Sequence, residues 1–161
     1  MQKAATFSPC RKYRYVLSRT WDDTKPMVLF IGLNPSTADE TNDDPTLIRC
    51  INFAKAWEYG GVCIANLFAY RATKPKDLLA RKSVIGKDNN HWLVKLAGDA
   101  DIVVAAWGNH GQYQHRASQV KAMITPLYYL KLTQQGQPSH PLYLKADLTP
   151  TLFQDDIKAA D

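Results

Sequence analysis

The sequence has few cysteines, and their spacing excludes two classes of small protein. Its 161 residues include three cysteines, Cys10, Cys50 and Cys63. No two of them form a Cys-x-x-Cys pair, and an odd number leaves one over. This pattern fits neither a disulfide framework nor a four-thiolate metal cluster. Cys50 and Cys63 stand among apolar residues, so we expect them to be small core side chains.

Long apolar runs are also missing. No run reaches the roughly 18 residues that a membrane helix needs, and residues 1–7 lack the apolar stretch of a secretory signal. We therefore expect a cytoplasmic protein with no membrane partner. A length of 161 residues, with 45% hydrophobic and 22% charged residues, is typical of one globular domain spanning residues 1–161.

Three common signatures of enzymes are absent. The sequence contains no Gly-x-Ser-x-Gly, no P-loop and no Gly-x-Gly-x-x-Gly. The sequence therefore contains no motif that would indicate a serine hydrolase, a P-loop NTPase or a dinucleotide-binding enzyme. No His-x-His or His-x-x-x-Glu spacing indicates a transition-metal site either. We predict no cofactor and no metal.

The charge that is present is basic and unevenly distributed. The net charge is +5 and the pI is near 9.1. Residues 1–25 carry six basic against two acidic side chains, and residues 71–87 carry six against one. An acidic stretch, residues 39–44, separates them. Two basic segments can bind a polyanion in a salt-dependent way, or they can simply form a solvated surface.

Apolar runs alternate with amphipathic segments along the chain. We expect an exposed or edge strand at 13–19, followed by buried strands at 27–31, 62–65, 102–107 and 127–130. We expect helices after Asp44, after Pro75, and over 88–97 and 113–124. This order predicts a three-layer α/β/α fold with a central, mostly parallel four-stranded sheet and an N-terminal edge strand or hairpin. Its core spans about residues 6–145, and the tail from Lys145 onward is weakly patterned.

Ligands of such sheets bind in loops beyond the carboxyl ends of the strands. The rule selects four segments, which are also where the unusual polar residues fall: 32–44, 66–71, 107–111 and 137–142. The last two segments contribute Trp107, Asn109 and a loop histidine, His140. A histidine on a polar loop can donate a hydrogen bond to developing negative charge. His110 is an intermediate candidate.

The first of these segments begins Gly-Leu-Asn-Pro-Ser. Gly32 permits a turn or a close ligand approach, and Pro35 fixes the shape of the turn. Asn34 presents both an acceptor and a donor at the strand end. Alternatively, Asn34 and Ser36 only cap a tight turn.

Three carboxylates follow on the same loop. Asp39 or Asp43 can act as a general base on water, or a pair can hold a divalent cation. Asp44 is predicted to cap the next helix, which makes it a weaker catalytic candidate.

The second segment starts with an asparagine at the end of a buried strand. The Asn66 carboxamide can pair with the edge of a nucleobase. Phe68 and Tyr70 can supply a stacking face, although core packing is the better interpretation for at least one of them. Arg71 closes the segment.

Taken together, GLNPSTAD, DDPT, NLFAYRAT, AAWGNHG and HPLYL resemble a family of small bacterial and phage proteins that is a domain of unknown function. The likeness covers roughly residues 6–145. The order of these motifs is also distantly similar to the uracil-DNA glycosylase superfamily.

The second resemblance implies roles for several residues. Gly32, Asn34 and Pro35 match the motif that positions the attacking water, and Asn66 with Arg71 matches the contact to a flipped base. His140 and Pro141 match the motif that stabilises the departing base. Asn34 stands where an aspartate would act as general base, and an amide cannot accept a proton. The cysteines that hold an iron–sulfur cluster in some branches are absent.

These observations leave three functions open. The first is a nucleobase N-glycosidase that acts on DNA or a nucleotide, in DNA repair or base modification. The second is a non-catalytic nucleic-acid or nucleotide binder on the same scaffold. The third is a metal-dependent phosphohydrolase built on Asp39, Asp43 and Asp44.

Overall fold

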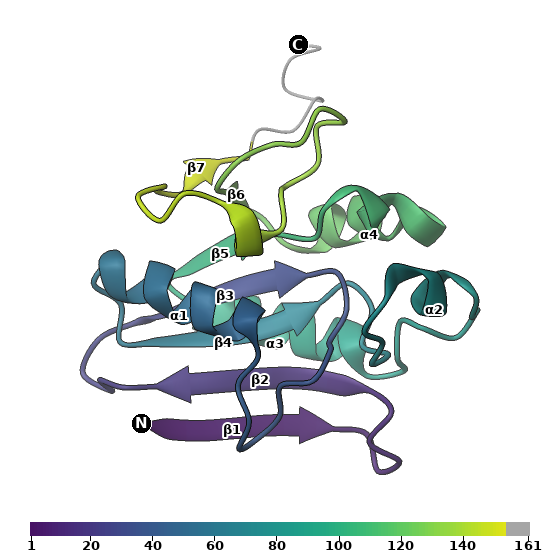
Figure 1. The fold of residues 1–161 in the computed structure, drawn as a ribbon, viewed down its shortest axis with the longest axis horizontal. Helices are drawn as coiled ribbons and strands as arrows, with labels where there is room; N and C mark the ends of the chain where they lie inside the picture. Colours follow the sequence, from purple (N-terminus) through teal and green to yellow (C-terminus); the bar gives the residue numbers. More distant parts are fainter. Residues whose placement is uncertain (154–161) are drawn as a thin grey trace.

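A computed structural model, which describes residues 1–153, shows a mixed α/β chain built on one seven-stranded sheet (Figure 1). The strand order is β1-β2-β4-β3-β5-β6-β7. The strands are β1 (Gln2–Phe7), β2 (Arg14–Thr20), β3 (Met27–Gly32), β4 (Gly61–Asn66), β5 (Ile102–Ala105), β6 (Tyr128–Tyr129) and β7 (Thr151–Leu152).

The predicted sheet of four strands is therefore too small. Its parallel part is present, because β4, β3, β5 and β6 pair in parallel. Antiparallel strands extend both edges: β1 and β2 form the N-terminal hairpin, one of the two predicted forms, on β4, and β7 pairs with β6. The two-residue β7 lies in the weakly patterned tail, where tertiary pairing rather than local sequence selects a strand. Residues 154–161 of that tail lie outside the described residues.

Helices cover both faces of the sheet, as expected for three layers (Figure 1). The α-helices are α1 (Pro45–Ala56), α2 (Pro75–Leu79), α3 (Asn89–Asp99) and α4 (Arg116–Met123), with 3₁₀ turns η1 (Asn109–His115) and η2 (Pro141–Tyr143). Alternating residues of β3 divide the core. Phe30 packs in the cluster that includes α1, while Ile31 packs in the cluster that includes α3 and α4.

Local signals explain where α1 begins. The Asp44 side chain accepts a hydrogen bond from the Leu47 N–H at 2.8 Å, and Pro45 occupies the first turn. The Asp44 cap was predicted, because an N-cap aspartate accepts from a free N–H group of the helix start. Pro45 also suits this position, because it has no N–H group that would be left without a partner.

Two element predictions need correction. The strand expected at 13–19 is not at an edge, because β1 covers β2 on one side and β4 on the other. The helix expected over 113–124 begins only at Arg116, since Gln114 and His115 adopt left-handed backbone conformations with φ of 54° and 56°. No helix among the described residues is long and apolar enough to cross a membrane.

Candidate functional site

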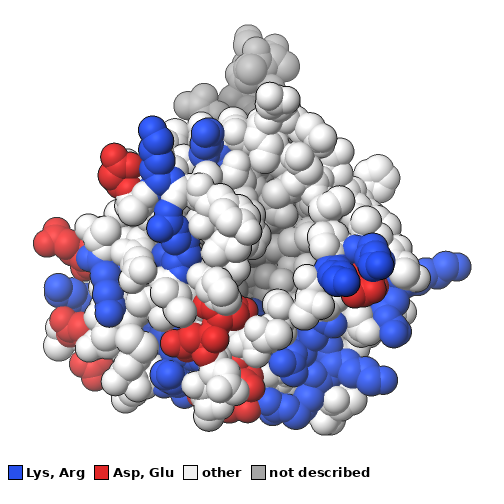
Figure 2. Space-filling view, viewed as in Figure 1, with Lys and Arg blue, Asp and Glu red and all other residues white. Residues whose placement is uncertain are grey.

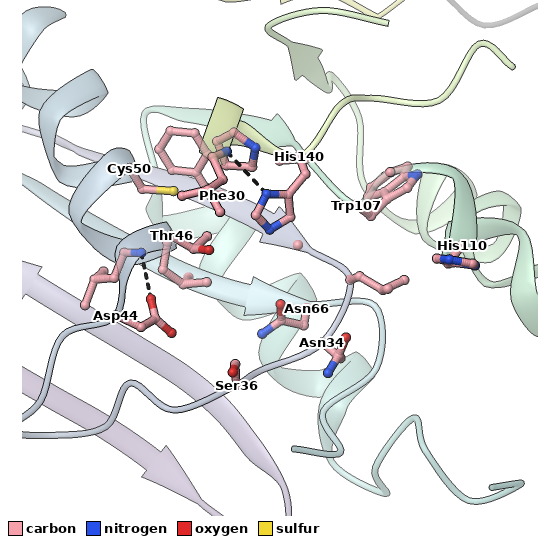
Figure 3. Close-up of a pocket in the computed structure, with 18 of the residues that line it drawn as sticks. Phe30, Asn34, Ser36, Asp44, Thr46, Cys50, Asn66, Trp107, His110 and His140 are labelled. Carbon is pink, nitrogen blue, oxygen red and sulfur yellow. Dashed lines mark hydrogen bonds between the residues drawn. The ribbon is translucent and has the colours of Figure 1, made fainter. Parts of the chain in front are cut away.

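A cavity of about 390 Å³ lies at the carboxyl ends of the parallel strands (Figure 3). Figure 2 shows a hollow on the same face, with charged side chains on both sides of it and below it. Gly32 and Asn34 enter it from the end of β3, Asn66 from the end of β4, and Trp107 from the end of β5. His140 completes the wall just before η2. A cavity of this size suits a small organic ligand.

Asn34 lines this cavity, and its Oδ1 has no hydrogen-bond partner among the described residues. Its Nδ2 donates to the carbonyl of Ala72 at 2.7 Å and to that of Pro35 at 3.1 Å. Both amide hydrogens are therefore directed to the backbone. The Oδ1 atom is left to accept a hydrogen bond from water or a ligand.

The Asn66 carboxamide is buried at the inner end of the cavity. The residue is 3% exposed, and its Nδ2 has no hydrogen-bond partner among the described residues. Gly32 makes room for it, because a Cβ at residue 32 would lie 2.8 Å from Asn66 Oδ1. A buried donor without a partner costs about 1–3 kcal/mol, so such groups are rare in native proteins. A bound ligand that accepts from Nδ2 would remove this cost.

The backbone beneath Asn66 is held from behind by buried polar side chains. Asn89 Nδ2 donates to the carbonyls of Asn66 and Leu67 at 2.9 and 3.1 Å. Arg116 Nε donates to the Leu67 carbonyl at 2.8 Å. These bonds fix the strand end from which Asn66 projects. Neither Asn89 nor Arg116 stood out in the sequence, because both occupy helices where polar residues usually face solvent.

The hydrogen bonding of His140 indicates which of its two ring nitrogens carries the hydrogen. Its Nδ1 accepts a hydrogen bond from the Leu142 N–H at 3.2 Å (Figure 3). In the neutral ring, Nε2 therefore carries the hydrogen and is a donor. The ring is open to solvent through the cavity, yet desolvation by the surrounding atoms lowers its pKa, with the Asp44 carboxylate acting in the opposite direction. The neutral imidazole is thus favoured.

The His140 loop is anchored on two sides. The Gly108 N–H donates to the Pro138 carbonyl at 2.7 Å, which joins the loop to the end of β5. Trp107 Nε1 donates to Gln137 Oε1 at 2.9 Å in the same region. On the other side, Arg49 of α1 donates to the Pro141 carbonyl at 3.4 Å.

Of the three loop carboxylates, Asp44 alone lines the cavity. Its second oxygen accepts from the Ala38 N–H at 3.3 Å. Asp39 instead accepts from the backbone N–H groups of Asn42 and Thr41, which lower its pKa. Asp43 forms an ion pair at 2.9 Å with the fully buried Arg19.

Asp39 and Asp43 therefore stabilise the loop, in contrast to their predicted catalytic roles. The sequence could place them on the correct loop but could not give the direction of their side chains. Within residues 1–153, no group of three or more His, Cys, Asp or Glu side chains could hold a metal ion. The phosphohydrolase hypothesis therefore has no metal-ligand cluster in the described part of the chain.

The predicted stacking residues lie elsewhere. Phe68 is fully buried and packs against Tyr113 with ring centroids 5.7 Å apart. Tyr70 lies under the Arg81 guanidinium, 4.8 Å from ring centroid to Cζ, outside the main cavity. Pro35 is buried and does not line the cavity either. For Phe68, core packing was the correct interpretation.

Other residues of the four predicted segments do line the cavity. Ser36 and Asn109 are among them, and Asn109 Oδ1 accepts a hydrogen bond from Thr133 Oγ1 at 2.6 Å. His110 lines it as well. Arg71 is absent from the wall and lies in an adjoining cavity.

Several lining residues were not among the predicted site residues, and Thr46, Cys50 and Arg14 are three of them. Thr46 and Cys50 belong to α1, where their helical spacing indicated only an amphipathic face. Arg14 is buried on β2. A buried arginine gives no sequence signal, because arginines are almost always exposed.

Comparison with protein families gives a match that covers most of the chain. A family model described as "Protein of unknown function (DUF1643)" matches residues 14–142. These limits enclose the lining residues of the main cavity, from Arg14 to Leu142. No curated protein and no solved structure matches the chain. None of these comparisons supports the resemblance to uracil-DNA glycosylases, which stays a prediction from the sequence.

Proposed function

The chain belongs to the family described as protein of unknown function (DUF1643), and we propose that it is a nucleobase N-glycosidase of the uracil-DNA-glycosylase type. It hydrolyses the base–sugar bond in DNA or in a nucleotide. One observation carries the proposal: Asn34, Asn66 and His140, which are far apart in sequence, line a single cavity at one edge of the sheet.

The cavity fits a flipped base in size and in chemistry. Its walls are largely apolar and include Phe30, Trp107 and Leu142, while a few polar groups converge on the interior. The buried Asn66 carboxamide is available to pair with a base edge, since its Nδ2 has no partner in the described chain. Apolar walls with few directed polar groups are typical of sites that bind an extruded base.

The reaction needs a positioned water molecule and a stabilised leaving group. Asn34 Oδ1 accepts a hydrogen bond from water and orients it toward the sugar C1′. The water oxygen bonds to C1′ as the bond from C1′ to the base nitrogen breaks, and the electron pair of that bond goes to the base. The Nε2–H of His140 donates to the base as its negative charge develops. The proton that water loses ends on the released base.

Asp44 replaces Asp39 and Asp43 as the carboxylate in this scheme. It is the acidic residue of the cavity wall, and both its oxygens accept hydrogen bonds from backbone N–H groups. Positive charge develops on the sugar as the base leaves, and a fixed carboxylate stabilises such charge. Its role is electrostatic, because one oxygen is held by the Leu47 N–H of α1 and the other by the Ala38 N–H of the preceding loop.

A binder without catalysis is the second candidate, and one observation favours it. Asn34 stands at the water-positioning place, and an amide cannot take up a proton. A protein that only binds would still show salt-dependent affinity for DNA through its basic segments. It would release no base after long incubation.

The two candidates are separated by a product assay. The full chain is incubated with oligonucleotides that contain uracil, hypoxanthine or other modified bases, and with the corresponding nucleotides. Abasic sites are detected by alkaline strand cleavage, and free base by chromatography. We expect base release from at least one substrate, with a loss of about 10²-fold or more in Asn34→Ala and His140→Ala, the range typical of such groups.

Matched controls use residues of the same type outside the cavity. Asn52→Ala on α1 and His91→Ala on α3 should retain full activity, since neither residue lines the cavity. Unchanged activity in both Asn34→Ala and His140→Ala would contradict the assigned roles. Tight binding with no product from any substrate would favour the non-catalytic candidate.

A further inference from the structure

Arg14 is a buried cation that forms no ion pair with a carboxylate of the described residues. It is 3% exposed and lines the cavity. Its Nη1 donates to the Ala38 carbonyl at 2.9 Å, whereas its Nε has no hydrogen-bond partner within residues 1–153. A buried charge without a partner is costly, so a counter-charge from elsewhere would be strongly favourable.

The surroundings of Arg14 do not neutralise it. Burial lowers its pKa to about 10, so the guanidinium stays charged at neutral pH. The Asp44 carboxylate partly offsets this effect, and the positive charge of Arg71 adds to it. Asp44 already accepts two backbone hydrogen bonds.

Arg71 lines a second cavity of about 490 Å³ that adjoins the first. Both cavities share Ser36, Ala72 and Thr73 in their walls. The Nε of Arg71 donates to the Ser36 carbonyl at 3.4 Å. Arg14 lines the first cavity and Arg71 the second, so each of the two cavities that meet at Ser36 has an arginine in its wall.

The second cavity has an excess of positive charge. Arg81 lines it together with Arg71, and Asp77 is its acidic residue. Figure 2 shows blue side chains gathered at the lower right, on the side of the molecule where α2 lies in Figure 1. The aromatic ring of Phe7 lies 5.0 Å from the Arg71 guanidinium carbon and helps to orient it.

We propose that a phosphate group of the substrate binds at this junction, between Arg14 and Arg71 beside Ser36. Phosphate fits because guanidinium groups bind it through charge-assisted, often bidentate hydrogen bonds. The proposal rests on the proposed function, in which the base occupies the first cavity. It adds that the protein holds the phosphate of this nucleotide or strand directly, so a nucleoside with the same base should bind more weakly.

The experiment measures binding of three ligands with the same base to the full chain by calorimetry: the nucleoside, its 5′-monophosphate and a short oligonucleotide. Inorganic phosphate serves as a competitor. We expect the monophosphate or the oligonucleotide to bind at least 10-fold more tightly than the nucleoside, and phosphate to reduce that advantage. A monophosphate that binds as tightly as the oligonucleotide identifies a mononucleotide substrate, and an advantage of the oligonucleotide alone identifies a strand.

Two substitutions locate the site. In Arg71→Gln, which changes a half-buried side chain, the advantage of the phosphorylated ligand should fall below 3-fold. Arg14→Lys keeps the buried charge but loses the planar donor, and should reduce the advantage several-fold. Lys95→Gln on α3 removes the same charge from a helix that does not line either cavity, and should retain the full advantage.

The outcomes test the phosphate subsite, which is the site proposed between Arg14 and Arg71, separately from the proposed function. Equal affinity for the nucleoside and both phosphorylated ligands would overturn the subsite, while base binding would still stand. An equal loss of the affinity advantage in Arg71→Gln and Lys95→Gln would also overturn the subsite, because the net charge of the protein would then explain the binding of phosphate. Phosphate binding that is lost in Arg71→Gln, without any binding of the nucleoside or release of base, would support the subsite and contradict the proposed function.

Discussion

The side chain of Asn66 fills the space that the missing Cβ of Gly32 leaves open. A Cβ at residue 32 would lie 2.8 Å from Asn66 Oδ1, closer than such atoms approach in proteins. The two residues face each other across paired strands, since Gly32 of β3 is in register with Asn66 of β4. The glycine of the first motif thus sets the position of the polar group in the second.

The substitution Gly32→Ala tests this relationship. The added methyl group should displace the Asn66 carboxamide and lower base release or ligand affinity about 10-fold, with a stability cost of about 1 kcal/mol. Activity assays and urea unfolding measure both effects. Gly98→Ala on α3 is the control, because a Cβ there meets open space. It should leave activity unchanged and raise the free energy of unfolding by up to about 1 kcal/mol. Full activity in Gly32→Ala would show that the position of Asn66 does not matter.

A second test asks whether Asp43 is structural. Asp43→Asn leaves the buried guanidinium of Arg19 without its carboxylate and should lower the free energy of unfolding by about 2 kcal/mol. Activity per folded molecule should change little, because Asp43 does not line the cavity. Asp99→Asn, which removes an exposed pair with Lys95, should cost at most about 0.5 kcal/mol. Loss of activity with unchanged stability in Asp43→Asn would instead assign it a part in the reaction.

A third prediction concerns pH. Desolvation lowers the pKa of His140, so the unfolded chain binds its proton at a higher pH than the folded chain does. The contribution of the neutral His140 ring to the free energy of unfolding is therefore complete above the ordinary histidine pKa. This contribution is lost as the pH falls from that value through the lowered pKa of the folded state. Nuclear magnetic resonance titration should show His140 with a pKa below the ordinary value, and His140→Gln should abolish this component of the pH dependence. A pKa above the ordinary value would contradict the prediction.

The thiols give a fourth test. Cys10 is exposed, and hydrogen bonds, above all with the Ser8 hydroxyl, lower its pKa. Burial raises the pKa of Cys50 and raises that of Cys63 to about 11. Because the thiolate is the reactive form, a thiol reagent at pH 8 should modify one cysteine rapidly and the other two only after unfolding. Cys10→Ser should remove the rapid phase. Rapid modification of Cys50 would show that the cavity wall at this buried residue opens to solvent.

Much of the parallel core could be predicted from the sequence. The continuous apolar residues of β3 and the Asp44-Pro45 start of α1 are local signals, because adjacent side chains determine burial and capping. The gathering of Asn34, Asn66 and His140 followed from topology, since the carboxyl ends of parallel strands share one edge.

Features that depend on distant partners could not be predicted. Arg14 and Arg19 look like surface residues of an edge strand, yet β1 and the loop at 36–44 cover them. The direction of Asp39 depends on its own loop conformation, in which it accepts from Thr41 and Asn42. The spacing of apolar residues predicts which face of a helix or strand packs against the core. It does not predict which buried charged side chain a distant loop will contact.

The cavity walls come from stretches of chain that meet only once β3, β4, β5 and the loop before η2 are in place. A compound that occupies the cavity therefore binds the native state and not the unfolded chain. Its presence at 100 times its dissociation constant would stabilise the native state by about 2.7 kcal/mol. A rise in melting temperature across a set of bases, nucleosides and nucleotides would accordingly identify the natural ligand before any reaction is observed.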